Sequence, residues 1–557
     1  MKLWGAAVLS AALLELPFPI AGPMPPWRSV FAWFGLVPLL WAILSPAAFA
    51  CRHPLRRPFL LSYLCGVLWY MGNCYWVRNT MMKYGDMPFG APTLLLIGFS
   101  LVLGLYFGLF GLGVILVRRA TGKTGLALIA APFLWVALDL AAARITSVPW
   151  DQLGYSQVDN CLGILVAPWT GVYGVSFILV SANAALIGLV LREPQVDRNW
   201  TSRSLTNLQI GVAFIGSLLA SSLGTKLLQP SHSLPTSPTA VLIQPNLDVG
   251  GDNDWIKPAD WEEHIAEVKK LASEQCKTYI AGIPQTGASN GEIICPPYAT
   301  HADLVVWPES PAPFNDVEPR FQQSMGSLAQ SEQAPLIVGG IGTSYHSPAE
   351  ETVEYFNSAM IFGADGNRVG RYDKIHLVPF GEYVPFAQYL TFARKLTGRV
   401  SAFSRGTDRK VFRLNGHHYG VFICYEAVFA DEVRHFAQLG ADVLVNISDD
   451  AWYGDTSAPW QHLNMARMRA IENRRWLLRD TNNGVTASID PYGRVRQSIP
   501  RHQADALPAQ YGFRDDITFY TAHGDVFAWL CAILSLGVVG WSFKANLRRV
   551  IHEKVRS

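Results

Sequence analysis

The segment Gly420-Val-Phe-Ile-Cys424-Tyr-Glu-Ala-Val-Phe429 joins a predicted strand to a predicted helix. Residues Tyr419–Ile423, before the cysteine, are apolar and β-prone, as expected of a buried strand. From 427 to 438 apolar side chains recur at helical spacing, and Gly440 stands where a helix cap belongs. Cys424 therefore lies where a strand passes into a helix.

A thiol at this point has two interpretations. At the edge of a sheet it is exposed, and the helix N-terminus lowers its pKa towards the thiolate, which favours a nucleophile. A lone cysteine is more often a small buried core residue. The local sequence leaves both open for Cys424.

Composition indicates a membrane protein with more than one part. Half of the 557 residues are hydrophobic and only 16% are charged, below the quarter typical of soluble proteins. A chain of this length exceeds a single core. The net charge of +2 gives no case for a nucleic-acid partner. The apolar excess is concentrated before residue 228 and after residue 524.

Apolar runs predict an integral membrane α-helical bundle of about eight spans. The first run also resembles a signal peptide, but prolines and another span follow it without a cleavage site. The runs at 92–117 and 163–191 exceed a simple span and must tilt or extend beyond the bilayer. The runs are 4–20, 28–48, 59–77, 92–117, 124–142, 163–191, 205–225 and 526–543.

Basic residues predict the orientation of these spans. Lys and Arg cluster after the second, fourth, sixth and eighth runs, for example at Arg56, Arg118, Arg192 and Arg548, whereas the alternate loops are poorer. The positive-inside rule then puts both termini in the cytoplasm. The long segment between the last two runs is expected on the outer side.

Three polar features interrupt the membrane part. The stretches 75–88 and 149–157 mix aromatic and polar residues, so they are either ordinary aromatic belts or contacts to lipid headgroups. Asp139 lies inside a run, where a carboxylate is a functional candidate unless it reaches water.

An α/β domain is predicted from Thr239 to about 515, after a Pro- and Ser-rich linker at 229–237. Turn signals at 365–367 and 490–493 predict two hairpins, which add antiparallel pairs to a mixed sheet. The excursion 274–300 carries Cys276 and Cys295, which could form a disulfide outside the cytoplasm. Short β-rich runs occur at 240–244, 304–307, 336–339, 359–362, 421–423, 443–447 and 485–489.

Three predicted strands end in reactive side chains. The strand 304–307 leads to Glu309, the strand 368–373 leads to Lys374, and the third ends at Cys424. Taken singly these are a helix cap, a surface charge and a core residue. Together they can converge on one sheet edge, where sites of α/β proteins usually lie.

This set of residues suits acyl transfer. Glu309 can take the thiol proton and return it to the leaving group. Lys374 and the backbone N–H of Tyr425 can stabilise an oxyanion, and Cys424 can form a thioester. No Cys/His spacing suggests a metal and no glycine-rich loop suggests a nucleotide, so we expect no cofactor.

The motifs around these residues resemble a known family. The blocks Trp307-Pro308-Glu309-Ser310, 372–385 and Cys424-Tyr425-Glu426 resemble the nitrilase (carbon–nitrogen hydrolase) superfamily with its Glu-Lys-Cys triad. The stretch 446–484 and the loop 149–157 extend the likeness, over nearly the whole chain, to bacterial apolipoprotein N-acyltransferases. The resemblance implies an αββα sandwich.

It also implies a two-step reaction and further site residues. Cys424 would take an acyl chain from a phospholipid, typically phosphatidylethanolamine, and pass it to the α-amine of a diacylglyceryl-cysteine at a lipoprotein N-terminus. Glu382 would lie near the Glu309–Lys374 pair, and Tyr425 and Glu426 would support the site. Residues matched to substrate binding are Trp255, Trp452 and Tyr155.

The chain departs from the family pattern at Asp449, where asparagine is common. Asp449 is expected to add a charge near the site and to alter substrate access. The excursion 274–300 is also longer than expected.

We therefore predict a seven-helix transmembrane domain (1–228), an extracytoplasmic catalytic domain (229–515) and a final span with a basic tail (516–557). The expected setting is the inner membrane of a bacterium, with the chain as a monomer. The alternatives are a membrane-anchored amidase or nitrilase with water as acceptor, and a transporter or lipid-binding module.

Overall fold

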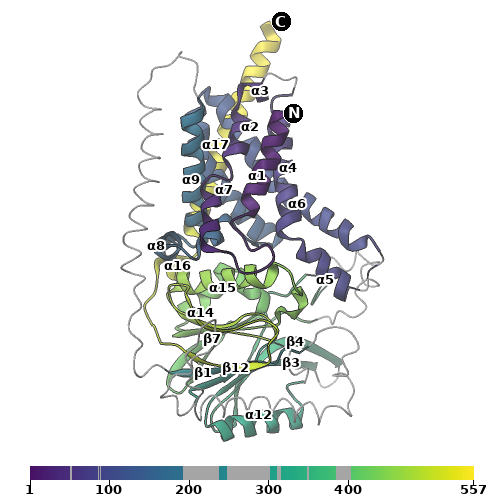
Figure 1. Cartoon of the computed structure of the whole chain (residues 1–557), viewed down its shortest axis with the longest axis vertical. Helices are drawn as coiled ribbons and strands as arrows, with labels where there is room; N and C mark the ends of the chain where they lie inside the picture. The colour runs from purple at the N-terminus through teal and green to yellow at the C-terminus, as the bar shows by residue number, and fades with distance from the viewer. Residues whose placement is uncertain are drawn as a thin grey trace.

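The computed structural model describes residues 1–49, 53–85, 87, 89–191, 238–247, 302–309, 315–347, 350–379, 381–383 and 403–556. A helical bundle stands on an α/β domain, and both chain ends lie at the end of the bundle far from the sheets (Figure 1). The predicted run 205–225, Trp255, Cys276 and Cys295 lie outside the described residues.

The membrane bundle is built from helices before residue 191 and after residue 518. Its first helices are α1 (Lys2–Glu15), η1 (Pro26–Trp33), α2 (Val37–Leu44), α3 (Pro46–Phe49), α4 (Arg56–Asn73), α5 (Trp76–Tyr84) and α6 (Ala91–Thr121). Then come α7 (Thr124–Ala141), η2 (Ala142–Thr146), η3 (Leu153–Gln157), α8 (Cys161–Thr170), α9 (Val172–Val190), α16 (Phe519–His523) and α17 (Val526–Arg556).

Among the described residues, five helical segments are long and apolar enough to span a membrane. They correspond to five of the eight predicted runs. The runs at 4–20 and 59–77 form α1 and α4, which are helices of 14 and 18 residues. The five segments are Pro26–Leu44, Ala91–Thr121, Thr124–Thr146, Val172–Val190 and Val526–Arg548.

The run 163–191, which was expected to tilt or to extend beyond the bilayer, forms two helices, α8 and α9. Gly171 separates α8 from α9 with a φ of 66°, a conformation that favours glycine. Pro168 also removes one backbone donor in the last turn of α8. The span is α9 alone, and α8 packs against α15 of the α/β domain.

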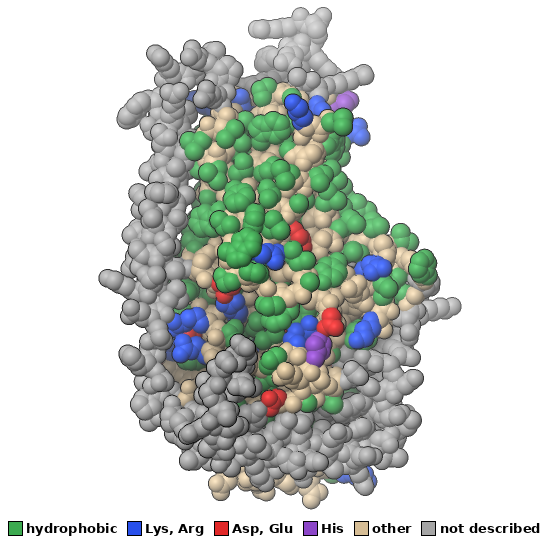
Figure 2. All heavy atoms as spheres, viewed as in Figure 1, with side chains coloured by type: hydrophobic (Ala, Val, Ile, Leu, Met, Phe, Trp, Pro, Cys, Tyr) green, Lys and Arg blue, Asp and Glu red, His purple; other side chains and the backbone are tan. Residues whose placement is uncertain are grey.

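Apolar side chains dominate the visible surface of the bundle (Figure 2). Large apolar side chains are exposed along α6, for example at Leu101 and Leu105. Others are exposed along α17, for example at Ile533 and Leu536. Exposed apolar surface of this extent is typical of a lipid-facing protein. Among the described residues, the helical bundle thus has the surface of a membrane-spanning domain.

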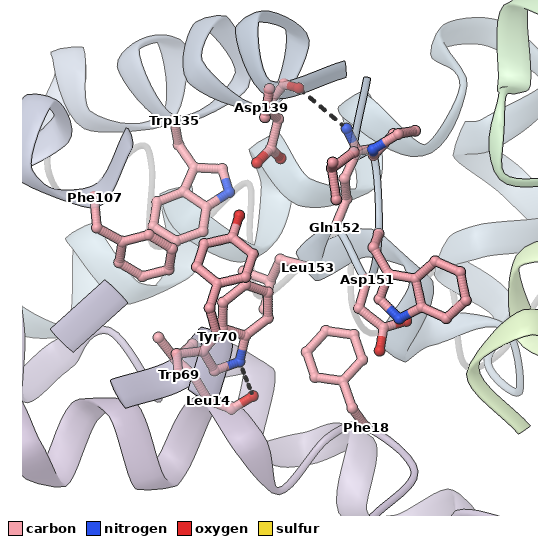
Figure 3. A pocket seen from close by; sticks show the side chains of 14 residues that line it. Leu14, Phe18, Trp69, Tyr70, Phe107, Trp135, Asp139, Asp151, Gln152 and Leu153 are labelled. Atoms are coloured by element: carbon pink, nitrogen blue, oxygen red, sulfur yellow. Dashed lines mark hydrogen bonds between the residues drawn. The ribbon is translucent and has the colours of Figure 1, made fainter. Parts of the chain in front are cut away.

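A narrow pocket opens inside the bundle, beside the loop that leads from α7 to η3 (Figure 3). Asp139, Asp151 and aromatic rings line it. Its volume of about 20 Å³ has room for a water molecule but not for a lipid. Asp139 thus faces a small cavity lined mostly by apolar and aromatic side chains, and one of its carboxylate oxygens has no partner among the described residues.

The α/β domain contains two six-stranded sheets. The first has the order β12-β1-β2-β3-β4-β5 and the second the order β11-β10-β9-β8-β7-β6. The strands of the first sheet are β1 (Thr239–Gln244), β2 (Leu304–Val306), β3 (Leu336–Ser347), β4 (Glu350–Phe362), β5 (Arg368–Asp373) and β12 (Asp505–Gln510). Those of the second are β6 (Val411–Leu414), β7 (His417–Ile423), β8 (Val443–Ser448), β9 (Trp476–Thr481), β10 (Thr486–Ile489) and β11 (Val495–Ile499).

Alternation along β1 explains the layers. Ala240 and Leu242 join the core that the two sheets share, whereas Val241 and Ile243 face the helix α12 (Pro319–Glu332). On the other side, α14 (Ala430–Gln438) and α15 (Ala458–Asn473) lie between the second sheet and the bundle (Figure 1). The αββα sandwich and both predicted hairpins, β4–β5 and β10–β11, are confirmed.

Candidate active site

Cys424 occupies a sharp turn at the end of β7. Its φ is 49°, a left-handed conformation that is rare for a residue with a side chain and is typical of functional turns. The following residues form a 3₁₀ turn, η5 (Cys424–Val428), and the α-helix begins only at Ala430. The predicted helix thus starts later than expected, although Gly440, with a φ of 97°, does end it.

Glu426 holds this turn in place. One carboxylate oxygen accepts the backbone N–H of Ile423 at 2.7 Å. The other accepts the hydroxyl of Tyr372 at 2.8 Å and the backbone N–H of Ile375 at 2.7 Å. Glu426 is completely buried, so these donors replace its water. Glu426 thus ties the turn at Cys424 to the end of β5. We had expected Glu426 to order this turn.

Glu309, Lys374 and Glu382 form one buried cluster. The Lys374 ammonium lies 3.0 Å from Oε1 of Glu309 and 2.9 Å from Oε1 of Glu382. Lys374 is 1% exposed, so the ammonium depends on these two carboxylates for charge compensation. The expected position of Glu382 beside the pair is observed.

The sequence suggested that the three strand ends meet at the edge of one sheet, but they belong to two sheets. Glu309 follows β2 and Lys374 follows β5 in the first sheet, whereas Cys424 follows β7 in the second. The groups meet because the two sheets pack face to face with these strand ends at the same side. The Cys424 thiol lies near enough to Glu309 and Lys374 for both charges to shift its pKa.

The surroundings of the Cys424 thiol favour its neutral form, whereas the sequence suggested a lowered pKa. Burial raises its pKa well above the usual value, and the Glu309 carboxylate raises it further, while Lys374 opposes both. Cys424 is 6% exposed and packs in the shared core, so the helix N-terminus does not offset the loss of water. Forming the thiolate therefore requires a base in contact with it.

Glu309 has the properties of that base. Burial alone would raise its pKa, but the Lys374 ammonium and hydrogen bonds from Lys374, Asn357 and Cys424 bring the pKa below its ordinary value. The pKa of Lys374 is raised: burial lowers it, and the charges of Glu309 and Glu382 more than offset that effect. The resting site thus contains a carboxylate, an ammonium and a neutral thiol.

Asn357 is a site residue that the sequence did not reveal. Its amide nitrogen donates to Oε1 of Glu309 at 2.7 Å and to Oε1 of Glu382 at 2.6 Å. It lies in β4, and a single polar residue in a strand carries no signal of its own. Only the neighbouring strand ends give this amide its two carboxylate partners.

A second hydrogen-bond network, formed by His462, Asp450 and Arg479, contacts the backbone of Cys424. Nε2 of His462 lies 3.0 Å from the carbonyl oxygen of Cys424, and Nδ1 lies 3.0 Å from Oδ1 of Asp450. Arg479 pairs with the other Asp450 oxygen at 2.7 Å. His462 belonged to the family-like stretch, but its contact with the cysteine backbone appears only in the folded chain.

The loop 149–157 and helix α5 form the seam between bundle and α/β domain rather than a free membrane surface. Trp150 Nε1 donates to Gln461 at 2.9 Å, and the Tyr84 hydroxyl donates to the Ala451 carbonyl at 2.9 Å. The Tyr425 hydroxyl reaches the Ser147 carbonyl at 3.0 Å. The site is therefore fixed to the bundle by hydrogen bonds.

The residues matched to substrate binding differ in exposure. Tyr155 is 1% exposed, and its hydroxyl accepts a hydrogen bond from buried Arg469 at 3.1 Å. Trp452 is 43% exposed at the seam, and its ring contacts that of Tyr84 with centroids 5.0 Å apart. Their contacts with substrate stay a prediction, and Trp255 lies outside the described residues.

Comparison with known proteins adds the family. A model described as carbon-nitrogen hydrolase matches residues 242–508, and one described as the apolipoprotein N-acyltransferase N-terminal domain matches residues 10–185. An apolipoprotein N-acyltransferase of Geobacter metallireducens is 34% identical over 98% of this chain and 96% of its own length. The chain belongs to the apolipoprotein N-acyltransferase family.

Other relatives agree with this membership. The apolipoprotein N-acyltransferase of Vibrio parahaemolyticus is 30% identical over 92% of this chain and 94% of its own length. Among solved structures, Nit3 of Saccharomyces cerevisiae, a member of the nitrilase superfamily, is matched over 53% of this chain and 97% of its own, with 18% identity and a TM-score of 0.35. The predicted family is confirmed by these curated relatives and by the two family models.

Proposed function

We propose that this protein transfers an acyl chain from a phospholipid, through a thioester on Cys424, to the α-amine of the diacylglyceryl-cysteine that begins an apolipoprotein. The relatives bear the name of this activity. The observation that carries the proposal is the buried cluster of Glu309, Lys374 and Glu382, in a domain joined to the membrane bundle. Its charges act on the neighbouring Cys424 thiol.

In the first half-reaction Glu309 removes the thiol proton as the Cys424 sulfur attacks the donor ester carbonyl. The oxyanion that forms is stabilised by the Lys374 ammonium and the backbone N–H of Tyr425. When this intermediate collapses, the ester C–O bond breaks, and the leaving glycerol oxygen takes the proton from Glu309. The products are the thioester and a lysophospholipid.

In the second half-reaction the α-amine of the acceptor attacks the thioester carbonyl. Glu309 accepts a proton from the amine, and the C–S bond breaks as the intermediate collapses. The Cys424 sulfur then recovers the proton from Glu309, and the acyl chain leaves as an amide. One base thus serves both steps, and the thiol returns to its neutral resting form.

Attachment to a membrane bundle suits an enzyme whose donor is a lipid. Each CH₂ group exposed to water costs about 0.8 kcal/mol, so neither the donor chain nor the acylated enzyme can cross water cheaply. The seam of Trp150, Tyr425 and Trp452 holds the site at the end of the bundle. A setting that limits water also protects the thioester until the amine arrives.

The proposal also includes a cellular location and an orientation. We place the protein in a bacterial inner membrane as a monomer, with both termini in the cytoplasm. The catalytic domain (229–515) and the loops 75–88 and 149–157 that contact it lie on the outer side, residues 1–228 form the transmembrane domain, and 516–557 form the last span with a cytoplasmic tail. The clusters of Lys and Arg in alternate loops support this orientation. Phosphatidylethanolamine is the proposed donor.

Mass spectrometry of Cys424 after incubation with phosphatidylethanolamine of defined chains tests the proposal. We expect a hydroxylamine-sensitive acyl adduct on Cys424 together with lysophospholipid, and transfer of the acyl group once a diacylglyceryl peptide is added. The adduct should be absent from Cys424→Ala and slow in Glu309→Gln. Release of free fatty acid without transfer would favour a hydrolase, and an adduct that persists in Cys424→Ala would refute the assignment.

A further inference from the structure

Asp449 and Asp450 are adjacent buried acids with opposite surroundings. They are 1% and 0% exposed, so neither carboxyl group has contact with water. Asp450 has the Arg479 guanidinium at 2.7 Å, the Ser448 hydroxyl at 2.8 Å and the ring of His462. After burial, which acts against ionisation, these partners bring the pKa of Asp450 below its ordinary value.

Asp449 has no such compensation. Its Oδ1 accepts the amide of Asn482 at 3.1 Å and the backbone N–H of Ala451 at 3.1 Å. Its Oδ2 has no hydrogen-bond partner among the described residues. The nearby cations are engaged elsewhere, because Lys374 pairs with Glu309 and Glu382, and Arg479 pairs with Asp450.

The position of Asp449 makes its charge important. Its backbone N–H donates to Oε2 of Glu309 at 2.9 Å, so it lies directly against the proposed base. Burial raises the pKa of Asp449, and the neighbouring Glu309 carboxylate raises it further. An unpaired anion buried here costs far more than an unpaired hydroxyl group. These surroundings oppose the added charge that the sequence led us to expect at Asp449.

We propose that Asp449 is a positioning residue that acts as a neutral carboxylic acid, and that its ionisation sets the alkaline limit of acylation. In the neutral form Oδ1 is the carbonyl oxygen that accepts both N–H groups, and the proton stays on Oδ2 throughout both half-reactions. Asp449 then orients the N–H that holds Glu309 without adding charge.

Ionised Asp449 would place a second anion beside Glu309. Negative charge that develops on the Cys424 sulfur and on the oxyanion would then be disfavoured, because like charges repel strongly at a buried site. The groups that face Asp449 and its contacts are Glu309, Lys374, Cys424, Asp450, His462 and Arg479. The first three belong to the proposed reaction, and the last three balance one another.

The test compares the wild type with Asp449→Asn, an isostere that cannot ionise. The acylation rate with phosphatidylethanolamine in detergent micelles is measured from about pH 6 to about pH 10, without acceptor, so that no acceptor amine titrates. We expect the wild-type rate to fall at least about fivefold at the alkaline end and the Asp449→Asn rate to stay level. Asp455→Asn, which removes an exposed acid from the same segment, should follow the wild type.

This inference rests on the proposed function, so a second readout separates the two. The rate at which iodoacetamide alkylates Cys424, followed by mass spectrometry across the same pH range, needs no acyl donor. In alkaline buffer we expect Asp449→Asn to be alkylated several-fold faster than the wild type relative to their rates at pH 7. Coincident profiles in both assays, whether level or falling, would overturn the role of Asp449. Absence of an acyl adduct with divergent alkylation would overturn the function alone.

Discussion

His462 contacts the backbone of Cys424, the proposed nucleophile: its Nε2 lies 3.0 Å from the carbonyl oxygen of Cys424. Because a carbonyl group only accepts hydrogen bonds, Nε2–H is the donor. The left-handed conformation of Cys424 turns this carbonyl away from the strand, so His462 supplies the partner that the sheet does not. The Trp150 ring from the membrane bundle stacks on His462 with centroids 6.2 Å apart.

Replacing His462 by Phe should slow acylation of Cys424. A buried carbonyl left without a donor costs about 1–3 kcal/mol, which corresponds to about a fivefold to hundredfold loss if the strained turn relaxes. His462→Gln keeps an N–H donor and should recover part of the rate. The measurement is the rate of acyl-adduct formation, with thermal unfolding as the check on folding. Equal loss in both variants would show that the donor is not what matters.

Replacing Asn357 by Leu should shift the acid limb of acylation to higher pH. Hydrogen bonding by Asn357 helps to lower the pKa of Glu309, and the base works only above that pKa. Without the amide the pKa of Glu309 rises, and a base whose pKa is higher by about one loses about tenfold in rate at a fixed acidic pH. The pH–rate profile of the first half-reaction measures this. Gln323→Leu, at an exposed position of α12, serves as the control. An acid limb at the same pH in Asn357→Leu and the wild type would count against the role of Asn357.

Replacing Arg469 by Met should destabilise the fold. Arg469 pairs with Glu472 at 2.7 Å, both side chains are fully buried, and Glu472 also accepts the backbone N–H of Val172 from the bundle. Removing one partner of a buried pair costs about 3–5 kcal/mol, whereas Arg469→Met with Glu472→Gln removes both charges.

Thermal unfolding in detergent should therefore give a clearly lower midpoint for Arg469→Met and a partial recovery for the double variant. Arg514→Met breaks the exposed pair with Asp516 and should change the stability by less than about 1 kcal/mol. A midpoint for Arg469→Met equal to that of the wild type would show that the buried pair does not hold the seam.

The orientation can be measured with single added cysteines. Gln323→Cys on α12 and Lys544→Cys near the end of α17 are exposed positions in the two parts. On intact spheroplasts an impermeant maleimide should label the first and should reach the second only after lysis, with the labelled peptides identified by mass spectrometry. The reverse pattern would place the catalytic domain in the cytoplasm.

Much of this arrangement could be predicted from the sequence. The strand before Cys424 and the hairpin that leads to Lys374 are short-range patterns, set by alternation and by turn residues. The apolar runs likewise predicted the five spans found among the described residues. The break at Gly171 was missed because a continuous apolar run does not reveal a change of direction.

The sequence by itself determined which groups were available: a thiol, an ammonium and carboxylates, each placed by its own strand or turn, together with the apolar helices. The tertiary structure alone decided that burial and Glu309 raise the pKa of the Cys424 thiol, and that Asn357 bridges two carboxylates. It also decided that the pKa values of Asp449 and Asp450 shift in opposite directions although the two are neighbours. The physical reason is that backbone patterns depend on residues close in the chain. The charge state of a buried group depends on the loss of water and on partners brought from distant strands and helices.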